Sequence, residues 1–213
     1  MSKDFVSSWN RKETTSLSGS IAQTIRKDPL KEKITKTIYN LSTIQHRLED
    51  SHLRTEQKHK TLFNKCVQAQ ETKNSQVAVM YANECAQVRK IAQTLVTSKL
   101  ALEQVVLRLE TVRDFGDIAA EIMPAASVVR TIKGRLAGVI PEVSMQLGSI
   151  SQTLDSMVLE AGEATGQTWN TMASGDDAER ILSEASTIAE QKVREGFPDM
   201  PASSTAEKGI NLP

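Results

Sequence analysis

Residues 30–48 read LKEKITKTIYNLSTIQHRL and belong to the stretch that decides the fold. Their apolar members recur at the spacing of one helical face: Leu30, Ile34, Ile38, Leu41, Ile44 and Leu48. Neither glycine nor proline occurs between Pro29 and Gly116, so the composition offers no signal that would stop a helix there. We expect this helix to begin at Asp28, a good N-cap, with Pro29 in the first helical position.

A second helical stripe follows a polar break. The break, QETKNSQ at residues 70–76, contains Asn74 and Ser75, which can turn a chain without glycine. From Glu84 to Val112 the apolar positions then alternate in threes and fours, the seam spacing of a coiled coil. Two helices of roughly 40 residues would each be about 60 Å long. Because the turn between them is short, we predict a long antiparallel hairpin.

Shorter helices follow the hairpin. We expect a break at Gly116 and Pro124, a third helix over 125–139 and a fourth through Val143 to Val158. After a glycine-containing linker, an amphipathic helix is expected to start near Asp176. The predicted fold class is therefore all-α, a long antiparallel helical hairpin plus shorter C-terminal helices. The predicted divisions are a flexible or membrane-proximal N-terminus (1–25), a helical core (26–165), a linker (166–175) and an acidic helix with a tail (176–213).

Composition narrows the class of protein. The 213 residues are 39% apolar and only 4% aromatic, which suits elongated helices with narrow seams better than a thick core. Cys66 and Cys85 have no framework spacing and are expected to be free thiols in a reducing compartment. The N-terminus is too polar for a secretory signal, and no apolar run reaches the roughly 18 residues of a membrane span. We expect a cytoplasmic protein that is at most peripheral to a membrane.

Charge is divided unevenly along the chain. Residues 1–113 carry 19 Lys and Arg against 11 Asp and Glu, a net +8, and residues 114–213 carry 7 against 15, a net −8. Such halves can attract one another. We expect the acidic half to fold over the basic hairpin in a closed state, although each half could also simply be solvated.

Motifs for catalysis are missing from the sequence. There is no phosphate-binding loop and no HExxH pair. His52, His59 and Cys66 are spaced by seven residues, about 10.5 Å along a helix, which is too far for neighbouring members to share one metal ion without a partner helix. We interpret them as polar seam residues that face another helix. We therefore expect neither an enzyme nor a cofactor, with a metal-containing helical-bundle enzyme as the remaining alternative.

Two N-terminal features predict binding to an anionic membrane. Phe5, Val6 and Trp9 fall on one side of a potential short helix beside cations, although this terminus could also be disordered or packed on the hairpin. The basic residues that open the first long helix are Arg26, Lys27, Lys31, Lys33 and Lys36. Few aromatic residues for base stacking lie nearby, so lipid is favoured and no nucleic acid is expected.

The tail EGFPDMPASS, residues 195–204, places Phe197 and Met200 each before a proline. This segment has few neighbouring residues to pack against, so we expect that these side chains cannot be buried within their own domain. Because the prolines favour an extended conformation, the segment is suited to binding a partner.

The order of these elements resembles the ESCRT-III family. Residues 121–163, EIMPAASVVRTIKGRLAGVIPEVSMQLGSISQTLDSMVLEAGE, resemble in particular the archaeal cell-division members of the CdvB type. The resemblance implies a subunit that polymerises on the inner face of the cell membrane at the division site. It also implies as partners further copies of the chain, paralogous ESCRT-III subunits and an AAA ATPase. The alternative is a soluble coiled-coil adaptor without a lipid role.

The resemblance also gives the tail a specific partner. FPDMP is similar to the type-two motif that binds the MIT domain of that ATPase. The matching positions are Phe197, Pro198, Met200 and Pro201.

Overall fold

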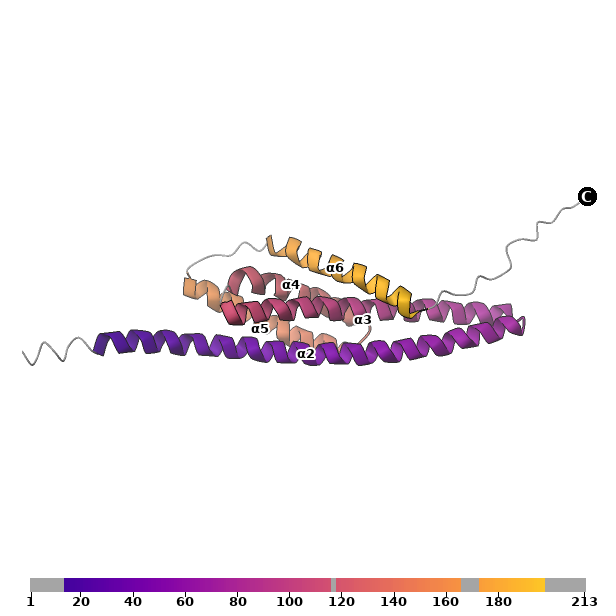
Figure 1. The fold of residues 1–213 in the computed structure, drawn as a ribbon, viewed down its shortest axis with the longest axis horizontal. Helices are drawn as coiled ribbons and strands as arrows, with labels where there is room; N and C mark the ends of the chain where they lie inside the picture. Colours follow the sequence, from indigo (N-terminus) through magenta and orange to yellow (C-terminus); the bar gives the residue numbers. More distant parts are fainter. Residues whose placement is uncertain (1–13, 116–117, 166–172, 198–213) are drawn as a thin grey trace, which may run out of the picture.

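The computed structural model describes residues 14–115, 118–165 and 173–197, and these residues form five helices. The helices are α2 (Thr14–Glu71), α3 (Ser75–Phe115), α4 (Ile118–Leu136), α5 (Pro141–Thr165) and α6 (Ala173–Gly196). Helices α2 and α3 lie side by side and antiparallel along the long axis of the molecule (Figure 1). The predicted all-α fold with a long hairpin and shorter C-terminal helices is confirmed.

The turn of the hairpin lies where the polar break predicts it. Lys73 adopts a positive φ of 56°, and the amide of Asn74 donates to the carbonyl of Ala69 at 2.9 Å. This geometry ends α2 in the left-handed manner typical of helix C-termini, with a lysine where glycine is more usual. The side-chain oxygen of Asn74 then accepts a hydrogen bond from the amide of Val77 at 3.3 Å and caps α3. The chain therefore reverses without glycine.

The main core lies where the shorter helices cover the hairpin. It joins residues of all five helices, and the expected apolar stripe contributes Ile34, Ile38, Leu41, Ile44 and Leu48 from α2. Helix α4 packs on α3 and α5, and α6 packs on α3 and α4. Towards the turn the hairpin extends beyond these helices (Figure 1). There a small cluster of Cys66, Ala69 and Ala78, with the partly buried Val77, Tyr81 and Ala82 against it, joins α2 to α3.

Two helices begin earlier than expected and run through a proline. Helix α2 begins at Thr14 rather than at Asp28, and α4 begins at Ile118 and contains Pro124. An internal proline removes one hydrogen bond and crowds the preceding turn, at a cost of about 3 kcal/mol. Around Pro124 that cost is offset by packing, because Pro124 and its neighbours Ile122 and Ala125 are buried. The positions of Pro29 and Pro124 therefore did not predict where these two helices begin.

Ion pairs connect the helices around the core. Lys99 of α3 binds Glu49 of α2 at 2.6 Å, and Arg108 of α3 binds Glu121 of α4 at 2.7 Å. All four side chains are partly exposed, so each pair adds little beyond fixing the register of neighbouring helices. Among the described residues, none of the helices is long and apolar enough to cross a membrane.

Candidate functional site

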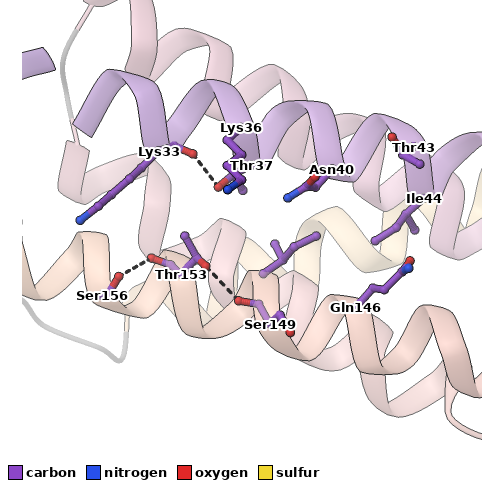
Figure 2. Close-up of a pocket in the computed structure, with 11 residues that line it drawn as sticks. Lys33, Lys36, Thr37, Asn40, Thr43, Ile44, Gln146, Ser149, Thr153 and Ser156 are labelled. Atoms are coloured by element: carbon purple, nitrogen blue, oxygen red, sulfur yellow. Dashed lines mark hydrogen bonds between the residues drawn. The ribbon is translucent and has the colours of Figure 1, made fainter. Parts of the chain in front are cut away.

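A polar cleft of about 540 Å³ separates α2 from α5 and contains part of the predicted basic patch. Helix α2 contributes Lys33, Lys36, Thr37, Asn40, Thr43 and Ile44 to its walls. Helix α5 contributes Gln146, Ser149, Ile150, Thr153 and Ser156. Figure 2 shows the two rows of side chains facing one another across the cleft.

The hydroxyl groups of Thr37, Thr43, Thr153 and Ser156 in the cleft donate to carbonyls of their own helices. Thr37 donates to the carbonyl of Lys33 at 2.8 Å, and Thr153 donates to the carbonyl of Ser149 at 3.0 Å (Figure 2). Their remaining lone pairs can accept hydrogen bonds, but neither hydroxyl donates to a base that could activate it. The cleft therefore offers hydroxyl lone pairs and lysine side chains to a polar ligand.

The basic residues near the cleft differ in their availability. Lys31 and Lys36 are exposed, whereas Lys33 forms an ion pair with Glu160 of α5. Arg26 and Lys27 belong to α2, but their side chains are not among those described, and Phe5, Val6 and Trp9 lie outside the described residues. Of the predicted membrane-binding residues whose side chains are described, Lys31 and Lys36 are therefore the ones that are freely accessible.

The second candidate site is the contact between the end of α6 and the hairpin. Phe197 is only 1% exposed and clusters with Ala189 and Val193 of α6 against Val88, Ala92 and Val96 of α3. The expectation that Phe197 has no room to be buried within its own domain is therefore wrong. Its binding pocket comes from residues about a hundred positions earlier in the chain, which the local sequence does not reveal.

Polar and aromatic groups of the hairpin complete the pocket of Phe197. The ring of His59 meets the ring of Phe197 edge to face, with centroids 4.6 Å apart, and the ring of His52 lies 6.3 Å away. The guanidinium of Arg89 donates to the carbonyl of Phe197 at 3.1 Å. The sequence alone did not indicate that His52, His59 and Arg89 would contact the tail residue Phe197. Two features of the sequence could have indicated this contact: the seven-residue spacing of the histidines and the Phe-Pro pair after α6.

The acidic helix α6 does not cover the basic patch. It lies against α3 and α4 (Figure 1), whereas Lys31, Lys33 and Lys36 are on α2, and Lys33 and Lys36 line the cleft between α2 and α5. The described side chains through which α6 contacts the hairpin are mainly apolar, with Phe197 the largest. The expected electrostatic cover by α6 is thus corrected: within the described residues, the C-terminal half supplies the patch with Glu160 of α5, which pairs with Lys33, and with Asp114, whose carboxylate lies near Lys31.

The residues considered as metal ligands are separated by packing. His59 faces Phe197, while the thiol of Cys66 points towards the carbonyl of Ala78 at 3.4 Å near the turn. Over 14–115, 118–165 and 173–197, no group of three or more His, Cys, Asp or Glu could hold a metal ion. The interpretation of His59 as a seam residue facing another part of the chain agrees with its 1% exposure.

The tail after Phe197 remains untested. Pro198, Met200 and Pro201 lie outside the described residues, so the assignment of this segment to an MIT domain stays a prediction.

Comparison with known proteins gives three archaeal relatives. The chain is 38% identical to Cell division protein B1 of Sulfolobus acidocaldarius over 208 residues, 98% of this chain and 94% of that protein. It is 31% identical to Cell division protein B of the same organism over 83% of this chain and 67% of that protein. Cell division protein B3 matches at 27% over 55% of this chain and 68% of that protein. No family model and no solved structure matches.

Proposed function

Because the chain belongs to the archaeal family of cell division proteins B, the CdvB type, we propose that it is a non-enzymatic subunit of a membrane-remodelling filament that constricts or severs the membrane during cytokinesis. Its proposed partners are further copies of itself and paralogous ESCRT-III subunits. It is proposed to act from the cytoplasm on the inner face of the cell membrane, without binding nucleic acid.

The observation that carries this proposal is the match to Cell division protein B1 over almost the whole of both chains. The shape of the molecule supports it. Two long helices extend beyond the shorter ones at the turn, so the hairpin offers an exposed lateral surface over much of its length (Figure 1). Apolar side chains such as Tyr39, Leu53 and Met80 are exposed along it. Scattered apolar residues of this kind are ordinary on protein surfaces, so contacts between copies that rest on them would be individually weak and reversible.

The proposed lipid contact is the basic end of α2. Lys36 is exposed at the cleft and Lys31 is exposed one turn earlier on α2, so both can approach phosphate headgroups without undocking any helix. Each lysine near an anionic surface contributes about 1 kcal/mol to binding. Arg26, Lys27 and the segment with Phe5, Val6 and Trp9 are proposed to extend the same surface.

Anionic vesicles test this function directly. We expect the wild-type chain to form tubes or rings on vesicles rich in an acidic phospholipid, as seen by electron microscopy. The double variant Lys31→Glu, Lys36→Glu is expected to bind at least about thirtyfold more weakly in cosedimentation, because two favourable contributions of about 1 kcal/mol are lost and replaced by repulsion.

A matched control makes two Lys→Glu changes at another place on the hairpin. Lys58→Glu with Lys90→Glu alters two exposed lysines nearer the turn and is expected to retain most of the binding. Bare vesicles with the wild-type chain would favour the soluble adaptor instead. Equal loss in both double variants would mean that overall charge, rather than this surface, determines binding.

The tail is proposed to recruit an AAA ATPase through its MIT domain. Phe197, Pro198, Met200 and Pro201 would bind as an extended segment. Since Phe197 is buried against α3 in this conformation, it would reach a partner only after leaving its own pocket. Recruitment and release of α6 would then be coupled.

Met200→Ala tests the recruitment while keeping Phe197, the residue of the motif that is buried against α3. Burying a methionine side chain contributes about 1.5–3 kcal/mol, so we expect the dissociation constant for the cognate MIT domain to rise about tenfold or more. The measurement is titration calorimetry with the whole chain, with Ser203→Ala as a neutral change in the same tail. Unchanged affinity in Met200→Ala would overturn the assignment of FPDMP.

A further inference from the structure

The pocket that holds Phe197 contains a buried titratable group. His59 is 1% exposed, and among the described residues neither of its ring nitrogens has a hydrogen-bond partner. Buried polar atoms are nearly always paired, so a ring with two unpaired nitrogens requires an explanation. His59 lies in the pocket where Phe197, the residue after α6, is held by ring contacts and by Arg89.

We propose that His59 is a proton-sensitive latch: its neutral ring accommodates Phe197, and its protonation releases the end of α6 from the hairpin. This inference needs only the docked α6. It is independent of the proposed function and would survive if the chain never assembled on a membrane.

The surroundings of His59 disfavour the imidazolium. A protonated ring would present two N–H donors to a site where no described residue offers either nitrogen an acceptor. It would also lie near the positive charge of Arg89 from α3. Burial lowers the pKa of His59, and the charge of Arg89 lowers it further. The docked state therefore holds this ring neutral.

The other charged groups around the pocket do not reverse this effect. On α2, Glu56 is engaged with Lys60 at 2.7 Å, and on α6, Lys192 adds a positive charge beside His52. The hydrogen bond from Lys99 lowers the pKa of Glu49, so this carboxylate stays ionised over the interval in which a histidine titrates. Burial raises the pKa of the Cys85 thiol, which stays neutral over the same interval.

The sign of the pH dependence follows from linkage. The pKa of His59 is lower in the docked state than in the undocked state, so the undocked state binds more protons. Docking is therefore complete above the ordinary histidine pKa and weakens as the pH falls through it. For an undocked pKa of about 6.5, lowering the pH from about 7.5 to about 5.5 is expected to raise the ratio of undocked to docked α6 about tenfold.

Hydrogen exchange of the α6 amides measures this ratio. A helix of this length is marginal when undocked, so its protection reports docking. After correction for chemical exchange, and relative to the amides of α5, the protection of α6 in the whole wild-type chain is expected to fall about tenfold over that pH interval. His59→Leu is expected to abolish the fall, because leucine fills the site without titrating.

Two controls make the result decisive. His46→Leu places the same change on an exposed histidine of α2 and is expected to keep the full pH response. An NMR titration of the wild-type chain is expected to give His59 a pKa below the ordinary range. An unchanged protection of wild-type α6 at the lower pH, a full response in His59→Leu, or an ordinary His59 pKa would each overturn the latch.

Discussion

Phe197→Ala is expected to detach the end of α6 while the hairpin stays folded. The side chain is 1% exposed and packs against Val88, Ala92 and Val96 of α3. Removing a buried phenylalanine costs about 3–5 kcal/mol. Each 1.4 kcal/mol corresponds to a tenfold change in an equilibrium, so the protection of α6 amides from hydrogen exchange should fall by about a hundredfold or to the level of an undocked helix.

The matched control is Ile188→Ala in the same helix. Ile188 is 44% exposed, so its truncation removes little packing and is expected to change protection by less than about twofold. The amides of α5 serve as an internal reference, because α5 does not share the cluster around Phe197. If Phe197→Ala left α6 as protected as in the wild type, the contact would not hold the helix.

Leu102→Ala is expected to destabilise the whole molecule. Leu102 of α3 is fully buried in the main core, which joins all five helices. Truncating a buried leucine costs about 2–5 kcal/mol, which is a large part of the stability of a typical domain. The free energy of unfolding in urea should fall by that amount, with the midpoint shifted and the slope unchanged.

Leu107→Ala provides the comparison on the same helix. Leu107 is 62% exposed, and its truncation is expected to alter the free energy of unfolding by less than about 0.5 kcal/mol. A similar loss in both variants would mean that the main core is not the source of stability assigned to it.

The sequence predicted the features of the fold that depend on neighbouring residues. The stripe from Leu30 to Leu48 and the polar break at Asn74 depend on local spacing and turn chemistry, and both match the structure. Pro29 and Pro124 were misleading, because a helix can continue through a proline when the loss of one hydrogen bond is offset elsewhere.

The candidate sites were less predictable than the fold. The pocket of Phe197 brings together His59 and Arg89, which are more than a hundred residues earlier in the chain. No local pattern encodes such a contact. The basic patch on α2 was visible as composition, but only the structure distinguishes the exposed Lys31 and Lys36 from Lys33, which Glu160 engages. The opposite net charges of the two halves suggested that the acidic helix would cover the basic patch. In the structure, α6 packs on the hairpin mainly through apolar side chains.

Phe197 directly follows the last residue of α6, and this position has a mechanical consequence. A force applied to the residues beyond it, directed away from the hairpin, would act first on this one contact and only afterwards on Val193 and then Ala189. Contacts that break one after another yield to a much smaller force than the same contacts stretched together. Helix α6 is therefore held firmly when no force acts on it, and it detaches readily when a force pulls on the residues after Phe197.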